Sequence, residues 1–497
     1  MIPPGLRRPS RMARSTGMRR TAFAKSSPKS RTGDVTFTPV LRSRSRSCRW
    51  FLPPGRRSKP SGLRRSRIHP ISRPMVQGGF RVKRNDARLS RNGVQAAQAN
   101  LLWAALGAIV LLACASGAGA QENAPSADFP ACKLPQHIDR DLTLDKRCVY
   151  EGGIEIGASN VVLNCNGAKI DARSARNGIR VRGKNIRDVK IQSCNVDGAF
   201  RQGILVDAPL TDKEITALPM PRRYEISPRG VEITNTTVSR SGSVGIYVDS
   251  YAQDTILSHV RILQAGGAGV YLEHSSVRTT IENSLISRSG HGDALGRHKR
   301  GMRREAIAID SSAYNRIRDN VIEDSLAGGI FLYKNCQEHH QKPDSVPRWQ
   351  HSSFNEIVGN EFRNEKVGVW IASRQTKNMK TWECGDPPLA EGYYRDYAEN
   401  NEIKGNRFIG GRVGVRIDDS LTRIVDNTFV RPKKACVELG SIVRDRVVGA
   451  PVASTVLAGN QCDTRGSAET YREIGKSRYA VCKDNSVNGD RFACGAE

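Results

Sequence analysis

A short alternation of apolar and variable positions recurs along the chain from Gly153 onward. Each copy starts with a small residue and continues as apolar, variable, apolar and often an acid. Period-two alternation of this kind is typical of a β-strand that buries one face. The copies begin at Gly153, Gly178, Gly203, Gly245, Gly269, Ala306, Gly329, Gly368 and Gly414, with a weaker tenth copy at Lys434.

The spacing of the copies indicates how the strands are arranged. Four intervals are long, and each of them contains a polar insert, at 208–228, 291–305, 336–352 or 375–398. Without these inserts the copies recur every 20–25 residues, which is the length of one β-solenoid coil with two or three short strands. The sequence therefore predicts an all-β, parallel β-helix of about ten coils over residues 150–465, with loop inserts on one side.

A second column of residues repeats with the same period. An Asn follows an apolar residue and two variable ones in five consecutive copies, at Asn320, Asn360, Asn406, Asn427 and Asn460. Asn tolerates the left-handed backbone conformation of a tight bend, and stacked Asn side chains bond one another along the axis. We interpret this column as structural and expect no chemistry from it.

These repeats resemble the right-handed parallel β-helix of the pectin-lyase-like superfamily over about residues 150–465. A leucine-rich repeat has a similar period, but its Leu-x-x-Leu-x-Leu frame is missing. The resemblance implies a carbohydrate-active or a periplasmic maturation-type protein. Mannuronan epimerases, polysaccharide lyases, pectin-type glycosidases and the maturation protein of nitrous oxide reductase share such repeats, so the resemblance implies the fold and leaves the reaction open.

The segments outside the repeat predict export. Residues 1–74 are a basic low-complexity leader that we interpret as a mis-assigned start, with translation beginning at Met75. Residues 75–120 then read as a signal peptide, with an apolar run over Leu101–Cys114 and a small-residue cleavage site at Ala118–Ala120. A retained membrane anchor and a lipid attached at Cys114 are the alternatives. Residues 121–149 and 466–497 are expected to cap the two ends, the latter with cysteines.

The net charge of +29 is unevenly distributed. Residues 1–120 hold 25 of the 78 Lys and Arg and two of the 49 acids, which leaves a net charge of +6 for residues 121–497. A charge argument for nucleic acid would rest on the leader alone. We therefore expect no nucleic-acid partner, no stable membrane span after cleavage, and a periplasmic or extracellular location.

The cysteines agree with an exported protein, because cleavage after Ala120 leaves an even number of them. Cys336 and Cys384 follow the same repeat strand on successive coils, about 5 Å apart, and are predicted to form a disulfide. Cys165 and Cys194 occupy similar places in neighbouring coils and are a second candidate pair.

Alternation along the strands also predicts which side chains point out of the coil. Ile246 and Val248 face inward, so Tyr247 and Asp249 face solvent. On successive coils this gives an aromatic column beside an acidic one, an arrangement that suits a sugar chain. Acids about 5 Å apart also raise one another's pKa, although an acid at a strand end is alternatively explained as organising the turn. The candidate substrate-binding residues are Tyr247, Asp249, Tyr271, Glu305, Phe331, Trp370 and Arg374.

The inserts are predicted to line one groove around Asp310, with a basic excess that suits an anionic glycan. Gly290-His291-Gly292 resembles the Gly-His-Gly of pectin-type hydrolases, but the companion motifs of that family are missing. The Asp-Pro-His-Asp segment of mannuronan epimerases is missing too. Cys336 and the nearby histidines lack a fixed ligand spacing, so no metal site is expected there.

The leading hypothesis is an exported polysaccharide lyase or C5-epimerase that acts on an acidic glycan. His291, Lys334 or Tyr333 would act as base or acid, and Arg374 would neutralise the substrate carboxylate. Asp310 and Glu273 would orient these groups or bind Ca²⁺. One alternative is a glycoside hydrolase in which Asp310 pairs with Glu273 or Asp249. Another is a non-catalytic periplasmic binding or maturation protein.

Overall fold

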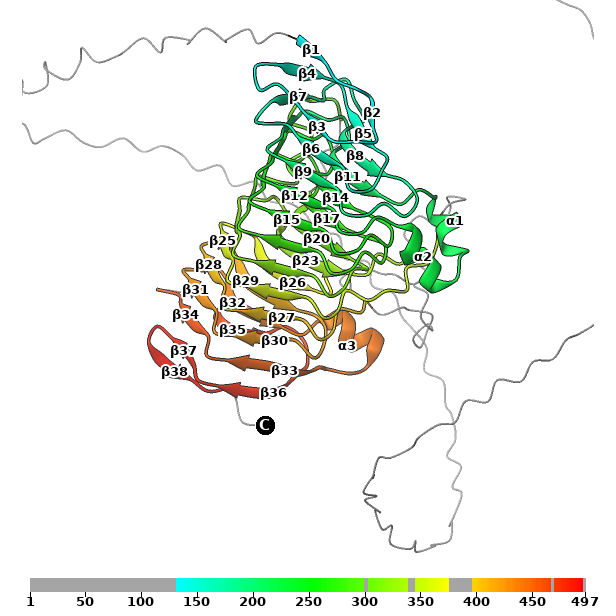
Figure 1. Ribbon diagram of the computed structural model, residues 1–497. Coiled ribbons are helices and arrows are strands. Elements are labelled where there is room, and N and C mark those ends of the chain that lie inside the picture. Colours follow the sequence, from blue (N-terminus) through cyan, green and yellow to red (C-terminus); the bar gives the residue numbers. More distant parts are fainter. Residues whose placement is uncertain (1–130, 299–302, 338–344, 375–395, 466–468, 495–497) are drawn as a thin grey trace, which may run out of the picture. The chain divides into compact units, whose positions relative to one another are not determined.

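The computed structural model describes residues 131–298, 303–337, 345–374, 396–465 and 469–494. These residues form three long sheets whose strands are used in rotation, so that every third strand along the chain belongs to the same sheet (Figure 1). All the strand pairs are parallel except the last one, between β37 and β38. The repeat region is therefore a parallel β-helix.

Sheet B contains the predicted repeat strands. Its twelve strands in the described residues include all ten sequence copies, and one more strand flanks them at each end. They are β2 (His137–Ile138), β5 (Ile154–Ile156), β8 (Asn177–Arg182), β11 (Gln202–Asp207), β14 (Ile246–Val248), β17 (Val270–Leu272), β20 (Glu305–Asp310), β23 (Gly328–Tyr333), β26 (Val367–Ile371), β29 (Val413–Ile417), β32 (Ala435–Leu439) and β35 (Glu469–Glu473).

Sheet C follows sheet B in each coil. It consists of β3 (Leu142–Thr143), β6 (Val162–Asn164), β9 (Lys190–Gln192), β12 (Glu232–Thr234), β15 (Ile256–Ser258), β18 (Thr280–Glu282), β21 (Arg316–Arg318), β24 (Glu356–Val358), β27 (Glu402–Lys404), β30 (Arg423–Val425), β33 (Val452–Ala458) and β36 (Ser477–Lys483).

Sheet A closes each coil. It consists of β1 (Ala131–Lys133), β4 (Val149–Glu151), β7 (Lys169–Asp171), β10 (Asn195–Asp197), β13 (Thr237–Ser239), β16 (Arg261–Leu263), β19 (Leu285–Ser287), β22 (Val321–Glu323), β25 (Glu361–Arg363), β28 (Arg407–Ile409), β31 (Thr428–Val430), β34 (Gln461–Asp463), β37 (Asn485–Val487) and β38 (Asp490–Phe492). The sheets thus run through residues on both sides of the 150–465 region.

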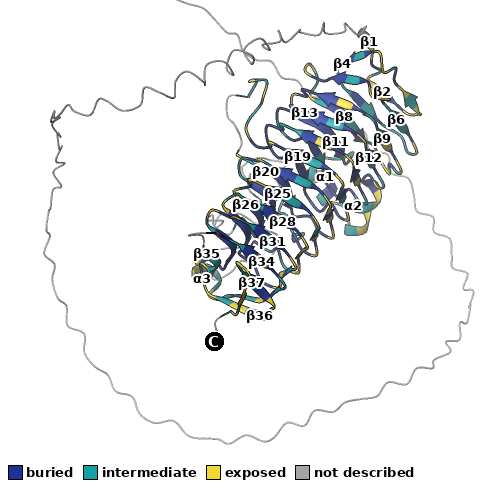
Figure 2. Cartoon of the chain, turned by 90° about the vertical axis from the view of Figure 1, so that its left-hand side faces the viewer, coloured by how far each residue is buried: buried dark blue, intermediate teal, exposed yellow. Residues whose placement is uncertain are grey.

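The strand register places similar side chains directly above one another on successive coils, which explains why the apolar repeat is visible in the sequence. Ile204, Ile246 and Val270 are direct partners on three adjacent strands of sheet B, and all three are buried. Figure 2 shows buried strands along the whole stack of coils. Each short strand buries its inward side chains only against the coils above and below it.

The Asn column is a hydrogen-bonded ladder inside the turns between sheets C and A. The side-chain N–H of Asn360 donates a hydrogen bond of 3.0 Å to Oδ1 of Asn406. The side-chain N–H of Asn406 donates a hydrogen bond of the same length to Oδ1 of Asn427. The expected bonding between stacked Asn side chains is confirmed, whereas the expected left-handed conformation of Asn was wrong. The left-handed residue is the preceding one, such as Asp319 with φ of 56° or Gly405 with φ of 62°. Asn is needed because its amide both donates and accepts along the axis.

The described helices are short and lie outside the coils. Helices α1 (Asp212–Thr216) and α2 (Met220–Ile226) form in insert 208–228, and α3 (Ile442–Val448) follows β32 (Figure 1). Within the described part of the chain, no helix is long and apolar enough to cross a membrane.

Candidate functional site

The outward face of sheet B is covered, which differs from the exposed face that alternation predicts. The outward side chains of Tyr271, Phe331 and Tyr333 form an apolar cluster separate from the core inside the coils. Asp310 is 0% exposed and Tyr333 is 2% exposed. The direction of these side chains follows the strand alternation, but the expectation that they reach solvent was wrong.

The inserts provide part of this cover. Ala208, Ile215 and Ile226 from the first insert pack with Tyr251 in a small apolar cluster beside sheet B. The third insert contributes Arg348, whose side chain is 12% exposed. Chain segments far apart in sequence therefore meet over the ends of β14, β17 and β20.

Asp310 ends β20 and accepts hydrogen bonds from three donors. The Tyr271 hydroxyl donates to Oδ2 at 2.6 Å, while the Asn335 backbone N–H (2.7 Å) and the Ser311 hydroxyl (3.1 Å) donate to Oδ1. Burial and the negative charge of Glu273 raise the pKa of Asp310 to about 7, although Tyr271 favours the charged form. The carboxyl also organises the turn, as the alternative explanation of the acids predicts.

Tyr333 lies beside Asp310 in register and is surrounded by charged groups. Its hydroxyl donates to Oε1 of Glu305 at 2.9 Å and accepts from Arg304 at 2.7 Å. The guanidinium of Arg374 lies 4.8 Å from the centre of the Tyr333 ring. Burial raises the pKa of Tyr333 well above its ordinary value, so the hydroxyl keeps its proton near neutral pH. We call Asp310, Tyr271, Tyr333, Glu305, Arg304 and Arg374 the Asp310 cluster.

A second group of charges lies toward the N-terminal coils. Arg348 donates to Oδ2 of Asp212 and Oε1 of Glu273, each at 3.1 Å, and the Tyr247 hydroxyl donates to the other oxygen of Glu273. Oδ1 of Asp212 lies 2.9 Å from Nδ1 of His274. Arg348 therefore compensates two acids at once, from a side chain that is only 12% exposed.

Asp249 shows the pKa effect expected of crowded acids. Burial comes first, and the charges of Asp212, Glu273 and Asp207 add to it, so the pKa of Asp249 is raised well above its ordinary value. Its Oδ1 accepts the Ser250 backbone N–H at 2.7 Å. Burial and the neighbouring acids therefore disfavour ionisation of Asp249.

One set of described side chains brings metal-ligating atoms together. Single ligand atoms of Asp212, Asp249 and His274 all lie within 4.8 Å of one another. A histidine nitrogen suits a transition metal more than Ca²⁺. Asp310 and Glu273 are the residues expected to bind Ca²⁺. Their carboxylates already accept hydrogen bonds from Tyr271, Asn335 and Arg348. They therefore fit poorly into the shell of roughly six to eight oxygen ligands that Ca²⁺ requires.

His291 does not join the Asp310 cluster, contrary to the prediction. It is exposed, and its Nε2 lies 2.8 Å from the carbonyl oxygen of Asp324, beyond β22 of sheet A. The end of this insert does reach the Asp310 cluster, through Arg304 and Glu305, but His291 at its start does not. In this insert, Arg297 donates to the carbonyl of Gly198, so the segment folds back over earlier coils.

Two other predicted residues have clear partners of their own. Lys334 is fully buried, and its ammonium donates to the Trp349 carbonyl at 3.2 Å. Trp370 packs edge-on against Phe331 and donates 3.0 Å to Oδ2 of Asp418. Trp370 therefore extends the aromatic column toward Asp418 and away from Asp310.

Sequence reasoning missed Asp212, His274 and Arg348. His274 directly follows the predicted residue Glu273, and the other two lie in predicted inserts. Their meeting depends on contacts across 62 and 136 residues, which no local pattern reveals. The best available signal was the pairing of inserts that follow the same repeat strand.

The disulfides join neighbouring coils. The expected pair Cys165 and Cys194 is bonded, with Cα atoms 4.7 Å apart. Cys336 is also disulfide-bonded, whereas Cys384 lies outside the described residues, so the Cys336–Cys384 pair stays a prediction. Three further disulfides join Cys132 to Cys148, Cys436 to Cys462 and Cys482 to Cys494. Such bonds suit an oxidising compartment.

Residues 152–380 match the family model described as a right handed beta helix region. The fold is a right-handed parallel β-helix. The match covers the coils from β5 to β26 together with the first three inserts, and it agrees with the three parallel sheets. No curated protein matches this chain.

Solved structures resemble the β-helix at low identity. The catalytic domain of a GH87 alpha-1,3-glucanase in complex with nigerose is 11% identical (TM-score 0.37; 72% of this chain, 63% of that chain). The periplasmic alginate epimerase AlgG is 12% identical, with a TM-score of 0.41, and the match covers 70% of this chain and 74% of that chain. A tailspike protein mutant of E. coli bacteriophage HK620 in complex with pentasaccharide is 10% identical, with a TM-score of 0.42. The match covers 71% of this chain and 60% of that chain. This chain spans about 63% of the length of the glucanase chain.

Proposed function

We propose that this β-helix is an exported enzyme that acts on an acidic polysaccharide, as a lyase or a C5-epimerase, at the Asp310 cluster. The observation that carries the proposal is a carboxyl group with a pKa of about 7, Asp310, beside a protonated tyrosine, Tyr333. A carboxyl group with a pKa near neutral pH can act as a general base, and a neighbouring hydroxyl group that keeps its proton can supply a proton as a general acid.

The proposed chemistry starts with removal of the proton on C5 of a uronate residue. Ionised Asp310 takes this proton, and Arg374 neutralises the carboxylate next to the carbanion that forms. In a lyase, the C4–O4 bond then breaks, a C4–C5 double bond forms, and Tyr333 donates a proton to the departing oxygen. In an epimerase, Tyr333 returns a proton to the opposite face of C5 instead.

Access to the cluster is part of the proposal. Asp310 is fully buried and Glu305 is 4% exposed, so a sugar ring reaches them only when the segments that cover them move aside. Tyr247, Trp370 and Arg374 are half-buried and would contact the chain first. Their aromatic faces suit the apolar faces of sugar rings, and Arg374 suits a uronate carboxylate.

The test is a panel of acidic polysaccharides, including alginate, polygalacturonate and hyaluronan, incubated with wild type and with Asp310→Asn. Ultraviolet absorbance reports unsaturated lyase products, and proton NMR reports epimerised residues. We expect one of these signals for wild type, and a large loss for the variant. No change in any glycan of the panel would contradict the proposal, and binding without any change would favour a non-catalytic role.

A glycoside hydrolase is the second candidate, because the charge of Glu273 is one of the causes that raise the pKa of Asp310. Two acids that influence each other in this way can divide the roles of general acid and nucleophile or base. New reducing ends without ultraviolet absorbance, lost in both Asp310→Asn and Glu273→Gln, would favour the hydrolase over the lyase.

A further inference from the structure

A second surface with an unusual composition lies at the junction of sheets B and C, away from the Asp310 cluster. In most of the described coils, one residue just before the sheet C strand adopts a left-handed conformation and donates its backbone N–H to a carbonyl of the next coil. In four consecutive coils these residues are Asp254, Arg278, Tyr314 and Phe354.

The left-handed conformation makes two of these residues costly. Asn is the usual non-Gly choice at such a position, and this chain uses Asn160 and Asn400 in other coils. Tyr314 and Phe354 adopt φ of 59° although aromatic side chains strain this conformation.

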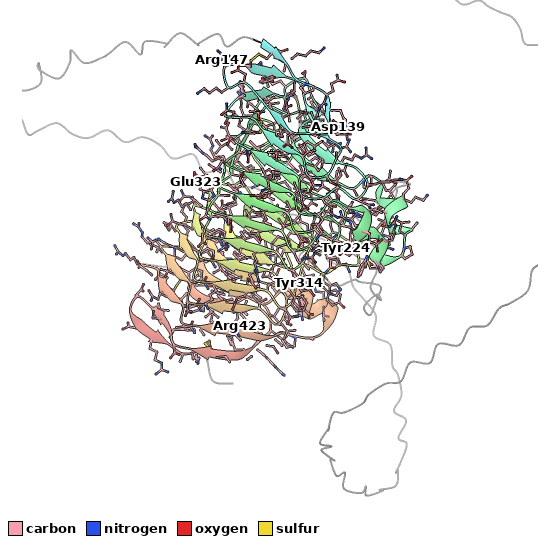
Figure 3. All side chains as sticks on the ribbon, in the orientation of Figure 1. Asp139, Arg147, Tyr224, Tyr314, Glu323 and Arg423 are labelled. Atoms are coloured by element: carbon pink, nitrogen blue, oxygen red, sulfur yellow. A yellow bond between two sulfur atoms is a disulfide. The ribbon has the colours of Figure 1, made fainter. Side chains whose placement is uncertain are left out.

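The two aromatic side chains are not packed into the protein. Tyr314 is 53% exposed and Phe354 is 48% exposed. Their rings stack on each other with centres 5.2 Å apart and planes 5° from parallel. Figure 3 labels Tyr314, which lies in the turn between β20 and β21. The stacked rings cover part of each other, and about half of each side chain remains exposed as apolar surface.

A groove of about 670 Å³ runs beside these rings. A second column lies along it, formed by residues that are direct partners on β15, β18, β21 and β24: Ile256, Thr280, Arg316 and Glu356. The groove therefore spans four coils, about 14 Å at about 4.8 Å per step. That length accommodates a short segment of an extended polymer.

The charges in the groove balance each other. Nε of Arg278 donates a hydrogen bond of 2.6 Å to Oδ1 of Asp254, and Nε of Arg316 lies 3.2 Å from Oε2 of Glu356. Two cations and two anions leave no net charge to attract a polyanion, while they provide donors and acceptors for hydroxyl groups. Flat apolar rings between hydroxyl-binding side chains are complementary to a pyranose, which has apolar faces and a polar rim.

We propose that the groove beside Tyr314 and Phe354 binds an uncharged segment of a glycan chain, with sugar rings lying on the two stacked side chains. This surface is a binding site without catalysis, and it does not depend on the proposed function of the Asp310 cluster. A polyanion, or a second copy of the protein, would be different occupants that the experiment separates.

The experiment is affinity electrophoresis of the full chain in native gels that contain hydroxyethyl cellulose, galactomannan, dextran or polygalacturonate. We expect at least one uncharged polymer to retard wild type. Tyr314→Asn/Phe354→Asn should weaken that retardation about tenfold or more, because both contact surfaces are lost. The melting temperature should stay equal or rise, because Asn relieves the left-handed strain.

Leu421→Asn is the matched control, since Leu421 is 40% exposed and has φ of 61° at the same turn position outside the groove. It should gain the same backbone relief and keep wild-type retardation, and Tyr314→Phe/Phe354→Tyr should also retain binding. The proposal is overturned if no uncharged polymer retards wild type, or if the Asn double variant is retarded as strongly as wild type. It is also overturned if polygalacturonate alone is bound through these rings, or if the rings hold a dimer in size-exclusion chromatography.

Discussion

The hydroxyl of Tyr271 donates a 2.6 Å hydrogen bond to the carboxylate of Asp310, and the two side chains come from adjacent strands of sheet B. Both residues are buried on the outer face of the coil. The tyrosine stabilises the ionised carboxylate, whereas burial and Glu273 oppose ionisation, and the balance leaves the pKa of Asp310 at about 7. A carboxyl group in this state can exchange a proton at neutral pH.

The first prediction is that Asp310→Asn lowers kcat/KM on the true glycan by about a hundredfold or more. Asn keeps the shape of the side chain and removes its charge. In wild type the activity should rise with pH through about 7, because a base accepts a proton only when it is ionised. Initial rates between pH 5 and 9 should show this rise in wild type and no such rise in the variant.

Asp418→Asn is the control for this change. Asp418 is also fully buried in the same column, and bonds Trp370 and Arg416, so both variants should lose a similar stability of about 1–3 kcal/mol. The Asp418 variant should keep most of its activity. An inactive Asp418 variant beside a fully active Asp310 variant would show that the site lies on other coils.

The second prediction concerns the charge bridge made by Arg348. Arg348→Met leaves Asp212 and Glu273 without their shared cation, so the free energy of unfolding should fall by about 2–3 kcal/mol. Adding Glu273→Gln should recover part of this loss, because it removes one of the unpaired charges. Urea unfolding of the three proteins measures both effects.

The exposed pair of Arg222 and Glu225 gives the control for Arg348. Both side chains are more than half exposed, so Arg222→Met should change the stability by less than about 1 kcal/mol. If Arg348→Met were as mild as Arg222→Met, the bridge over sheet B would be a surface ion pair only.

The fold was predictable because each coil repeats the same local choices. Ile246 and Val248 alternate with outward residues in one strand, and equivalent residues stack on them one period later. The sequence also indicated the Asn ladder, although the residue before each Asn adopts the left-handed turn. Interactions between adjacent coils leave a periodic record that a single sequence carries.

The candidate site was predictable only in part, because the inserts have no such period. Alternation placed Tyr271 and Asp310 on one face, but the position of Arg348 over that face depends on how an insert folds. His291 was wrongly placed for the same reason, since Arg297 fixes its insert to the carbonyl of Gly198. The cover that excludes water from Asp310 is therefore a property of the tertiary structure alone.

The third prediction is that Asn406→Ala destabilises the protein by about 2 kcal/mol or more without affecting the site. The Asn406 amide accepts from Asn360 and donates to Asn427 and to the Ile357 carbonyl, all of them buried in the ladder. Removal leaves these partners unsatisfied. The melting temperature of the variant should fall, while its activity below that temperature should equal that of wild type.

Asn195→Ala makes a suitable comparison, because Asn195 is exposed and its amide donates to the Gly167 carbonyl. Water can replace that hydrogen bond, so the free energy of unfolding of the Asn195→Ala variant should stay within about 0.5 kcal/mol of wild type. Equal losses for the two variants would mean that the ladder contributes no more than any surface amide.

The last prediction concerns Glu365, a buried carboxyl group away from the Asp310 cluster. It is 3% exposed, and its Oε1 accepts the Ser325 backbone N–H at 3.1 Å. Burial raises the pKa of Glu365 from 4.5 to about 8, and the charges of Asp324 and Glu323 add to this effect. Between these two pH values the folded protein keeps the proton and the unfolded chain loses it.

The sign of the pH effect follows from that difference in bound protons. Because the folded state binds more protons, the contribution of Glu365 to the free energy of unfolding falls as the pH rises from about 4.5 to about 8, and is constant outside this window. Glu365→Gln has the shape of the protonated acid and does not titrate. Its stability relative to wild type should therefore increase across the same window and then level off. Urea midpoints of both proteins at pH 4, 6 and 8.5 test this, and parallel profiles would show that Glu365 is ionised in the folded protein.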